Sequence, residues 1–90
     1  MHVAKAKDVE VKLRFGSRLR ELRLAAGLSQ EELAEASDLD RTYISSTERG
    51  QRNISLEAMT QIAAALKVSV AAFFDGSVAS QPKKAAGGQA

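Results

Sequence analysis

One short polar segment of the sequence carries side chains suited to contacts with nucleic-acid bases. It begins at Arg41, whose forked guanidinium can donate to O6 and N7 of a guanine. Thr42 adds a methyl group that can meet thymine, and the hydroxyls that follow can reach base or phosphate oxygens. The candidate base-contacting residues are Arg41, Thr42, Tyr43, Ser45 and Ser46. On an ordinary surface helix these residues would indicate only a solvated face, so the prediction of base contact depends on the elements that position them.

Two further groups of polar residues could bind phosphate oxygens beside that segment. Gln30 stands at the expected start of a helix, where its amide and the exposed backbone N–H groups can hold a phosphate. A polar stretch follows the base-contacting segment, and its candidates are Arg49, Gln51, Arg52 and Asn53. A plain hydrophilic loop would explain the polarity of this stretch but not its position, so we favour phosphate contact.

The sequence offers no comparable arrangement for catalysis or metal binding. It has no cysteine, and its one histidine, His2, lies at the amino end. No nucleophile with a base, no metal-ligand spacing and no phosphate-binding glycine loop is visible. Paired carboxylates such as Glu31 with Glu32 or Glu35 fit a solvated helix face. We therefore predict no enzyme activity, no cofactor and no metal site.

The composition predicts one small domain that acts in the cytoplasm and has no membrane partner. The chain has 90 residues, 44% of them apolar, which is enough for a core. Chains this short usually gain stability from disulfides, metal or a partner subunit, so self-association is the expected source here. No apolar run approaches the roughly 20 residues that span a bilayer, and no signal peptide is apparent. The net charge of +2 is too small to indicate nucleic acid by itself.

Apolar residues recur at helical spacing along the middle of the chain, and four capping signals divide it into five short helices. The expected N-caps are Ser29, Asp40, Ser55 and Ser69, and the expected helix stops are Gly27 and Gly50. The inward-facing residues of the five helices are, in order, Phe15, Leu19, Leu22 and Ala26; Leu33 and Ala34; Ile44 and Thr47; Met59, Ile62, Ala63 and Leu66; and Val70, Phe73 and Phe74. An all-α fold follows, because helices this short are stable only when packed together.

The second and third predicted helices form a unit of about residues 29–50. The second helix runs from about Gln30 to Ala36, with a capping box of Ser29 and Glu32. About four residues separate it from the third helix, and Leu39 among them packs the turn. Two helices joined in this way cross steeply, so that the second can enter a major groove while the first lies across the backbone.

The two ends of the chain differ from this middle part. Residues 77–90 are almost all small or polar, which predicts a disordered C-terminal tail. Residues 1–10 form an N-terminal extension of mixed character, in which Val9, together with Leu13, could extend the first helix backwards. The helix-turn-helix domain is therefore predicted to span residues 11–76.

From Phe15 to Phe74 the sequence resembles the lambda-repressor-like helix-turn-helix family, also called the XRE or Cro/C1 family. The matching features are, in order, Arg23, the GLSQEELA run from Gly27 to Ala34, Ile44, the ERG of Glu48 to Gly50, and the IAAALKVS run from Ile62 to Ser69. The match departs at Asp38, where the family usually has glycine in the turn. Aspartate tolerates a left-handed backbone better than most residues, so we expect the turn to survive.

The resemblance implies a compact five-helix DNA-binding domain whose recognition helix begins at Arg41, with double-stranded operator DNA as its partner. Within the family, the LDRTYIS run from Leu39 and the ERGQRNISL run from Glu48 are similar to controller proteins of restriction-modification systems. Those proteins bind operators as dimers and regulate their own gene and that of the endonuclease. An activator would also need a surface for RNA polymerase, for which the acidic face of the second helix is the candidate.

Other functions stay open beside this one. Antitoxins and phage- or plasmid-type repressors share parts of the same runs, and some helix-turn-helix domains bind a protein partner instead of DNA. A protein-docking domain would keep the core but would not require Arg41, Thr42 and Arg52. Their presence favours DNA.

The resemblance also implies a buried ion pair between Arg23 and Glu48, which would have a structural role. A homodimer interface is predicted separately, from the two adjacent aromatic residues of the fifth helix. Phe73 and Phe74 offer more aromatic surface than so small a domain can easily bury, so one should belong to the core. The other, with Val70 and parts of the fourth helix, is expected to pack across a twofold axis.

Overall fold

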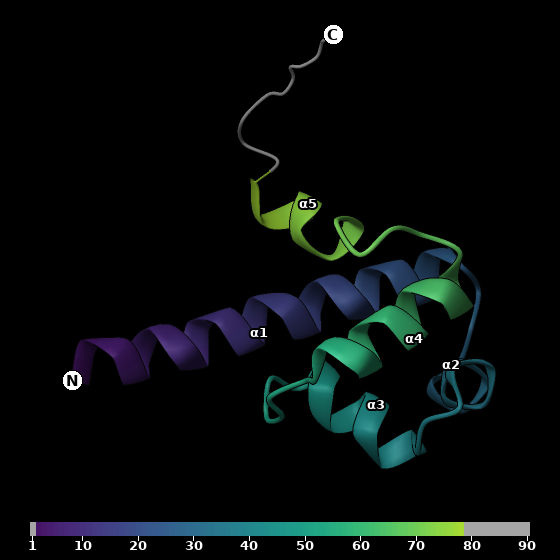
Figure 1. The fold of residues 1–90 in the computed structure, drawn as a ribbon, viewed down its shortest axis with the longest axis horizontal. Helices are drawn as coiled ribbons and strands as arrows, with labels where there is room; N and C mark the ends of the chain where they lie inside the picture. The colour runs from purple at the N-terminus through teal and green to yellow at the C-terminus, as the bar shows by residue number, and fades with distance from the viewer. Residues whose placement is uncertain (1, 79–90) are drawn as a thin grey trace, which may run out of the picture.

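The computed structural model describes residues 2–78, and the side chains of residues 8–75 (Figure 1). Over this range the chain forms five helices and no strand: α1 (His2–Ala25), α2 (Gln30–Ser37), α3 (Arg41–Glu48), α4 (Leu56–Leu66) and α5 (Ala72–Val78). The predicted five-helix, all-α class is confirmed. Of the predicted C-terminal tail, residues 77–78 belong to α5, and residues 79–90 lie outside the described part of the chain.

The other helices are arranged around α1. This helix lies between α5 on one side and the remaining helices on the other (Figure 1), and it contacts both α3 and α5. The eight-residue helix α2 packs against α3 and α4. Each helix places one large apolar side chain at the centre of the core, and these residues, Leu19, Leu33, Ile44, Ile62 and Phe73, are at most 1% exposed. Burying a side chain of this size stabilises the fold by roughly 1.5 to 3 kcal/mol.

Three of the four predicted N-caps are present. The Ser29 hydroxyl accepts a hydrogen bond from the backbone N–H of Glu32, and the Glu32 carboxylate accepts one from the N–H of Ser29, at 3.0 and 2.8 Å. Asp40 caps α3, and Ser55 caps α4. These contacts satisfy N–H groups that the start of a helix leaves without a partner, which explains why local sequence located the helix starts well.

The fourth predicted cap was wrong, because α5 begins three residues after Ser69. The N–H of Ala72 donates to the carbonyl oxygen of Ser69 at 3.0 Å, and that of Phe73 donates to the carbonyl of Val70 at 3.1 Å. Bonds of this spacing form a tight turn before the helix proper. Val70, predicted on the fifth helix, therefore lies in the turn that precedes it.

The turn between α2 and α3 adopts the left-handed backbone that we expected of Asp38. This residue has φ 61° and ψ 41°, and its N–H donates to the carbonyl oxygens of Ala34 and Glu35. The N–H of Leu39 also donates to Ala34, at 2.9 Å. The last carbonyls of α2 are thus satisfied, and the chain is redirected into α3 without glycine.

The first helix is longer than the sequence predicted. It begins at His2, so the predicted N-terminal extension, as far as the structure describes it, is a continuation of α1 that projects beyond the other helices (Figure 1). Residues 2–15 include no glycine or proline to stop a helix. At the other end, Ala26 was predicted to face inward but is exposed after the last residue of α1, while Arg23 is buried. No helix of the described residues is long and apolar enough to span a membrane.

A close approach of backbones at Gly16 fixes how α1 crosses the end of α3. A Cβ atom on Gly16 would lie 2.4 Å from the carbonyl oxygen of Thr47 and 2.6 Å from that of Glu48. Both neighbours are backbone atoms and cannot rotate away. Glycine costs helix stability at such a position, and here the crossing requires it.

We predict that Gly16→Ala destabilises the domain by about 1 to 3 kcal/mol, because the added methyl group pushes α1 away from α3. Thermal and denaturant unfolding would measure this change. Gly27→Asn is the matched control, since Gly27 has φ +75° and no atom within 4 Å of its missing Cβ, and asparagine tolerates that backbone. Equal stability of the Gly16 variant and the parent chain would show that the crossing is not constrained there.

Candidate DNA interface

The recognition-helix candidate α3 exposes its first residues and buries its later ones. Arg41 and Thr42 are exposed and Tyr43 is half-buried, whereas Ile44 to Thr47 are all buried. The Asp40 carboxylate accepts from the N–H of Thr42 at 3.1 Å and fixes the helix start. In Figure 1, α3 lies at the lower edge of the molecule, with α2 to its right. The first residues of α3 therefore present their side chains to solvent, while the buried residues that follow hold the helix in place.

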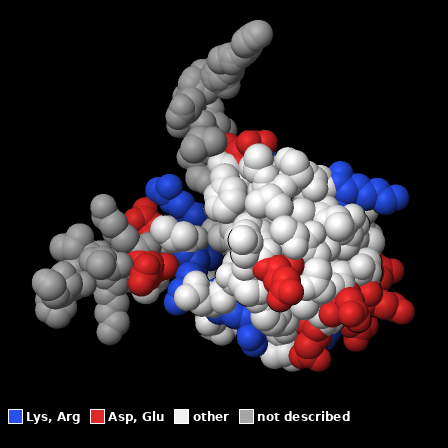
Figure 2. Space-filling model, in the orientation of Figure 1, with Lys and Arg blue, Asp and Glu red and all other residues white. Residues whose placement is uncertain are grey.

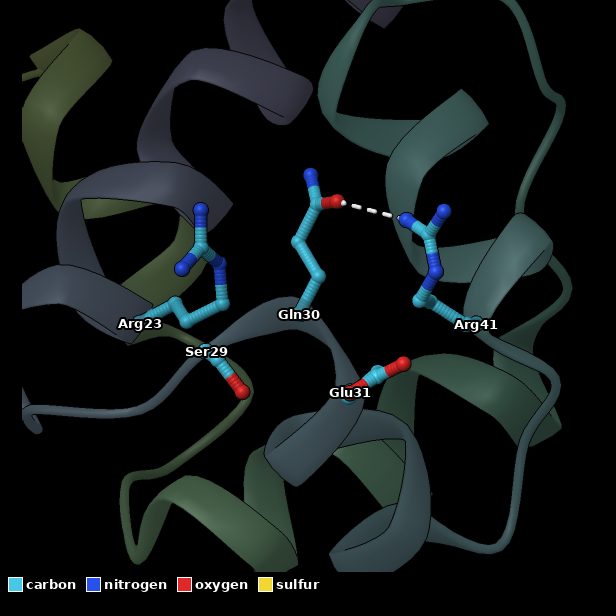
Figure 3. Close-up of a pocket in the computed structure, with 5 residues that line it drawn as sticks. All are labelled: Arg23, Ser29, Gln30, Glu31 and Arg41. Carbon is cyan, nitrogen blue, oxygen red and sulfur yellow. Dashed lines mark hydrogen bonds between the residues drawn. The ribbon is translucent and has the colours of Figure 1, made fainter.

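An open pocket lies where the start of α2 meets the start of α3. Its lining residues are Arg23, Ser29, Gln30, Glu31 and Arg41 (Figure 3). The Gln30 side chain stands between the two arginines, and its Oε1 accepts from an Arg41 terminal nitrogen (NH1) at 3.2 Å. A predicted phosphate contact and a predicted base contact are thus adjacent and joined by a hydrogen bond.

Arg23 and Glu48 form a buried ion pair behind this pocket. The Arg23 Nε donates to Glu48 Oε2 at 2.6 Å, and a terminal nitrogen (NH2) donates to Oε1 at 3.0 Å. The two side chains are only 8% and 4% exposed. The other terminal nitrogen (NH1) donates to the carbonyl of Leu28 at 2.8 Å. The pair therefore joins the end of α1, the loop before α2 and the end of α3.

The ion pair also keeps Arg23 charged despite its burial. The hydrogen bond to Glu48 raises the pKa of Arg23, while burial lowers it and the charge of Glu48 raises it further. The hydrogen bond and the charge of Glu48 together raise the pKa of Arg23 by more than burial lowers it. Arg23 is consequently held in its charged form in the folded domain.

The side chain of Tyr43 makes contacts within the protein. Its hydroxyl accepts from the N–H of Ser55 at 3.1 Å, and the guanidinium carbon of Arg52 lies 4.4 Å from the centre of its ring. Arg52 Nε donates to the Ser46 hydroxyl at 2.8 Å, and that hydroxyl donates to the Thr42 carbonyl at 2.7 Å. This cluster fastens the loop before α4 to α3 and holds Arg52 beside the recognition helix.

Two residues predicted to contact bases have little free surface in this structure. Ser45 and Ser46 are each 8% exposed. The Ser45 hydroxyl, like that of Ser46, donates to the carbonyl of Thr42, at 3.3 Å. Hydroxyls that bond to the preceding helical turn satisfy themselves locally. Base contact by these two serines stays a prediction that requires their hydroxyls to leave the helix backbone.

The predicted phosphate-binding loop follows α3 directly. Arg49, Gln51 and Asn53 are exposed, and Arg49 Nε donates to Gln51 Oε1 at 3.3 Å. Figure 2 shows acidic side chains gathered at the lower right, on the side of α2, whereas cationic side chains lie mostly on the other side, toward α1 and this loop. The face around α3 is thus flanked by opposite charges.

Of the predicted dimer-interface residues, one belongs to the core. Phe73 is 1% exposed and its ring centre lies 5.0 Å from that of Phe15. Phe73 is thus the aromatic residue of the pair that belongs to the core, and it has too little surface left to contact a second subunit. Phe74 is 44% exposed and Val70 is half-buried. These two residues remain candidates.

Two polar side chains outside the predicted site residues join helices that are distant in sequence. Arg18 Nε donates to the carbonyl of Ala72 at 2.8 Å and ties α1 to the start of α5. Gln61 Nε2 donates to the carbonyl of Ser37 at 2.9 Å and ties α4 to the end of α2. Each bond joins residues far apart in sequence, so no local pattern indicated it.

Two short helices joined by a left-handed turn, the second exposing its N-terminus, define a helix-turn-helix protein. Comparison with known families agrees, because the family model described as helix-turn-helix matches residues 19–73. This match covers more than half of the chain. The chain therefore belongs to the helix-turn-helix family.

Several relatives of the chain are named as control or controller proteins. It is 46% identical over 66 residues to the control protein C.MunI of Mycoplasma sp, covering 72% of this chain and 89% of that one. It is 49% identical over 59 residues to the control protein C.BamHI of Bacillus amyloliquefaciens, and the match covers 64% of this chain and 73% of that protein. Among solved structures, the restriction-modification controller protein C.AhdI from Aeromonas hydrophila is 51% identical to this chain, with a TM-score of 0.71. The match covers 72% of this chain and 98% of that one.

We predict that Glu48→Gln lowers the free energy of unfolding by roughly 3 to 5 kcal/mol, because it leaves the Arg23 charge buried without its partner. Denaturant unfolding would measure the loss. The exposed pair of Arg14 and Glu10, whose side chains are 61% and 60% exposed, provides the control, and Glu10→Gln should change stability by less than about 1 kcal/mol. If the two variants lose the same small amount, the buried pair has no structural role.

Proposed function

We propose that this chain is a transcription regulator that binds a palindromic operator in double-stranded DNA as a homodimer. A twofold dimer would set two α3 helices about 34 Å apart, one turn of DNA, with each reading one half-site in the major groove. The observation that carries the proposal is the exposed start of α3, which projects Arg41 and Thr42 from a helix whose remaining residues are anchored in the core.

Arg41 and Thr42 are the proposed base readers. Both are exposed, and the geometry of a guanidinium fork suits the O6 and N7 acceptors of guanine. Tyr43, Ser45 and Ser46 extend the set, but their side chains already contact Ser55, Arg52 or the helix backbone. We infer that the first two residues determine most of the sequence preference, and that Tyr43 and Ser46 also hold α3 and Arg52 in position.

Phosphate contacts are proposed on both sides of the readers. On the α2 side, one N–H of the Gln30 amide is used within the protein and the second can donate to a phosphate oxygen. On the far side lie the residues of the polar loop, Arg49, Gln51, Arg52 and Asn53. Arg52 uses its Nε for Ser46, which leaves the donors on its terminal nitrogens for a phosphate. Such contacts set the register of α3 on the duplex without selecting sequence.

The relatives support a controller of a restriction-modification system, which would regulate its own gene together with that of an endonuclease. A regulator of this kind acts in the cytoplasm, where the DNA is. If it also activates transcription, the exposed carboxylates of α2, Glu31, Glu32 and Glu35, are the proposed contact for RNA polymerase. A neighbouring methyltransferase and endonuclease gene would support this assignment, whereas a neighbouring toxin gene would favour an antitoxin.

The proposed dimer uses the surface around α5. Phe74 exposes 44% of its surface beside the core ring of Phe15, whose centre lies 6.0 Å away. Val70, in the turn before α5, is half-buried and lies on the same short segment. Apolar and aromatic residues are favoured at the centres of homodimer interfaces. Burying this patch would also add stability to a domain of limited size.

We predict that Arg41→Ala weakens operator binding by about 1 to 3 kcal/mol, with the loss concentrated at one base position in each half-site. The measurement is a binding titration against the DNA upstream of the chain's own gene and against duplexes that each change one base pair. An unchanged preference for every base would remove Arg41 from the readers, and with it the main support for sequence-specific binding.

Arg49→Ala is the matched control, because Arg49 is exposed, its Nε donates to the exposed Gln51 side chain, and it is proposed to contact phosphate alone. We expect it to weaken operator and unrelated DNA to a similar degree. The slope of log affinity against log salt should flatten by about one ion. The two arginine variants together therefore separate base reading from phosphate contact.

We predict that Phe74→Lys shifts the protein from dimer to monomer, because a charge replaces apolar surface at the interface. Sedimentation at micromolar concentration would show the shift, and operator affinity should fall with it. Val11→Lys is the control, since Val11 is 59% exposed and lies on α1, outside the predicted interface. A parent chain that stays monomeric with and without operator would contradict the proposed dimer.

A further inference from the structure

The first helix lies directly against the start of the polar loop that follows α3. A Cβ atom on Gly50, in this loop, would be 2.6 Å from Leu13 Cδ2 and 3.0 Å from Leu13 Cα. Further along α1, Gly16 meets the last carbonyl oxygens of α3 equally closely. Because residues three apart share one side of a helix, this side of α1 faces both the end of α3 and the first residues of the loop.

Lys12 stands on the same side of α1, four residues before Gly16. Side chains four apart on a helix lie one above the other, so Lys12 continues the row that meets α3 and the loop. It is half-buried, whereas the side chains of Arg14 and Glu10, on other sides of the helix, are 61% and 60% exposed and pair with each other at 3.0 Å. No ion pair among residues 8–75 includes Lys12. Its charge is thus held beside the loop without a protein anion paired to it.

The part of the loop that α1 contacts is itself cationic. Gly50 lies between Arg49 and Arg52, which are both proposed above to contact phosphate. Figure 2 shows cationic side chains mostly on this side of the molecule, toward α1 and the loop and away from the acidic side chains near α2. A surface with one sign of charge attracts ligands of the opposite sign. The ligand that fits this surface is the phosphate backbone of the duplex that the loop is proposed to contact.

We propose that Lys12 binds a phosphate of the operator next to those held by the loop, so that α1 extends the DNA-contacting surface. This inference rests on the proposed binding of DNA by α3 and the loop. One strand of a duplex carries a phosphate charge for every ~3.4 Å of helix axis, so a strand that passes the loop also offers phosphates to its neighbours. Lys12 lies before residues 19–73, which match the helix-turn-helix family model. The contact is therefore an addition to the matched unit.

The test is Lys12→Gln, measured by titrating the DNA upstream of the chain's own gene and an unrelated duplex over a range of salt concentrations. We expect affinity for both duplexes to fall by the same factor, about three- to tenfold at about 0.1 M salt, and the slope of log affinity against log salt to flatten by about one ion. The preference between the two duplexes stays unchanged, because a phosphate contact does not read sequence. Lys12→Arg should retain the affinity and the slope, because a phosphate accepts from either cation.

Arg14→Gln is the matched control. It removes the same charge two residues further along α1, from a side chain that lies on another side of the helix and already pairs with Glu10. We expect its affinity and salt slope to stay close to those of the parent chain, since exposed charges away from the duplex are screened by salt. Thermal unfolding of each variant checks that the domain is folded.

The inference is wrong if Lys12→Gln leaves the salt slope unchanged while Arg49→Ala flattens it. The loop then contacts DNA without α1, and the proposed function stands. It is also wrong if Arg14→Gln weakens binding as much as Lys12→Gln, because net charge then explains both losses. A parent chain that binds neither duplex contradicts the proposed function, and this inference fails with it.

Discussion

The arrangement of the helices depends on one buried ion pair. Of the three ion pairs among the described residues, only that of Arg23 with Glu48 is buried on both sides. Taking two charges out of water is costly, and the pair compensates only through good geometry and additional hydrogen bonds. Here the guanidinium donates to both carboxylate oxygens and to the Leu28 carbonyl. Because these contacts come from three segments, the pair specifies where α1, the following loop and α3 meet.

Neither α2 nor α3 could be stable alone, since each has only eight residues. Their geometry is therefore imposed by packing. Ile44 and Thr47, at most 1% exposed, fix the inner face of α3, and the absent side chain of Gly16 allows α1 to lie against its last carbonyls. The direction in which Arg41 projects is consequently a property of the whole core rather than of the helix that carries it.

The sequence predicted local structure correctly where the interaction that determines it lies within one short segment. The caps at Ser29, Asp40 and Ser55 and the left-handed Asp38 all depend on residues within a few positions, and the structure has them. The contacts that sequence did not indicate join distant segments. They include the Gly16 crossing, the Arg18 bond to Ala72 and the Gln61 bond to Ser37. The late start of α5 was also not indicated, although the turn between Ser69 and Ala72 that precedes it is held by local backbone bonds.

The hydroxyls predicted to contact bases differ from Arg41 in the contacts that they already make within the domain. By residue type alone, every serine and tyrosine hydroxyl of α3 could bond to DNA. A serine hydroxyl lies close to the helix backbone, however, and can donate to a carbonyl of the preceding turn instead. Ser45 and Ser46 bond to the Thr42 carbonyl, and Tyr43 accepts from Ser55. Arginine differs, because its long side chain extends past the backbone and its five donors exceed what the domain uses. The short helix α3 thus uses most of its polar groups for contacts within the domain, while Arg41 keeps donors available for the proposed contact with a base.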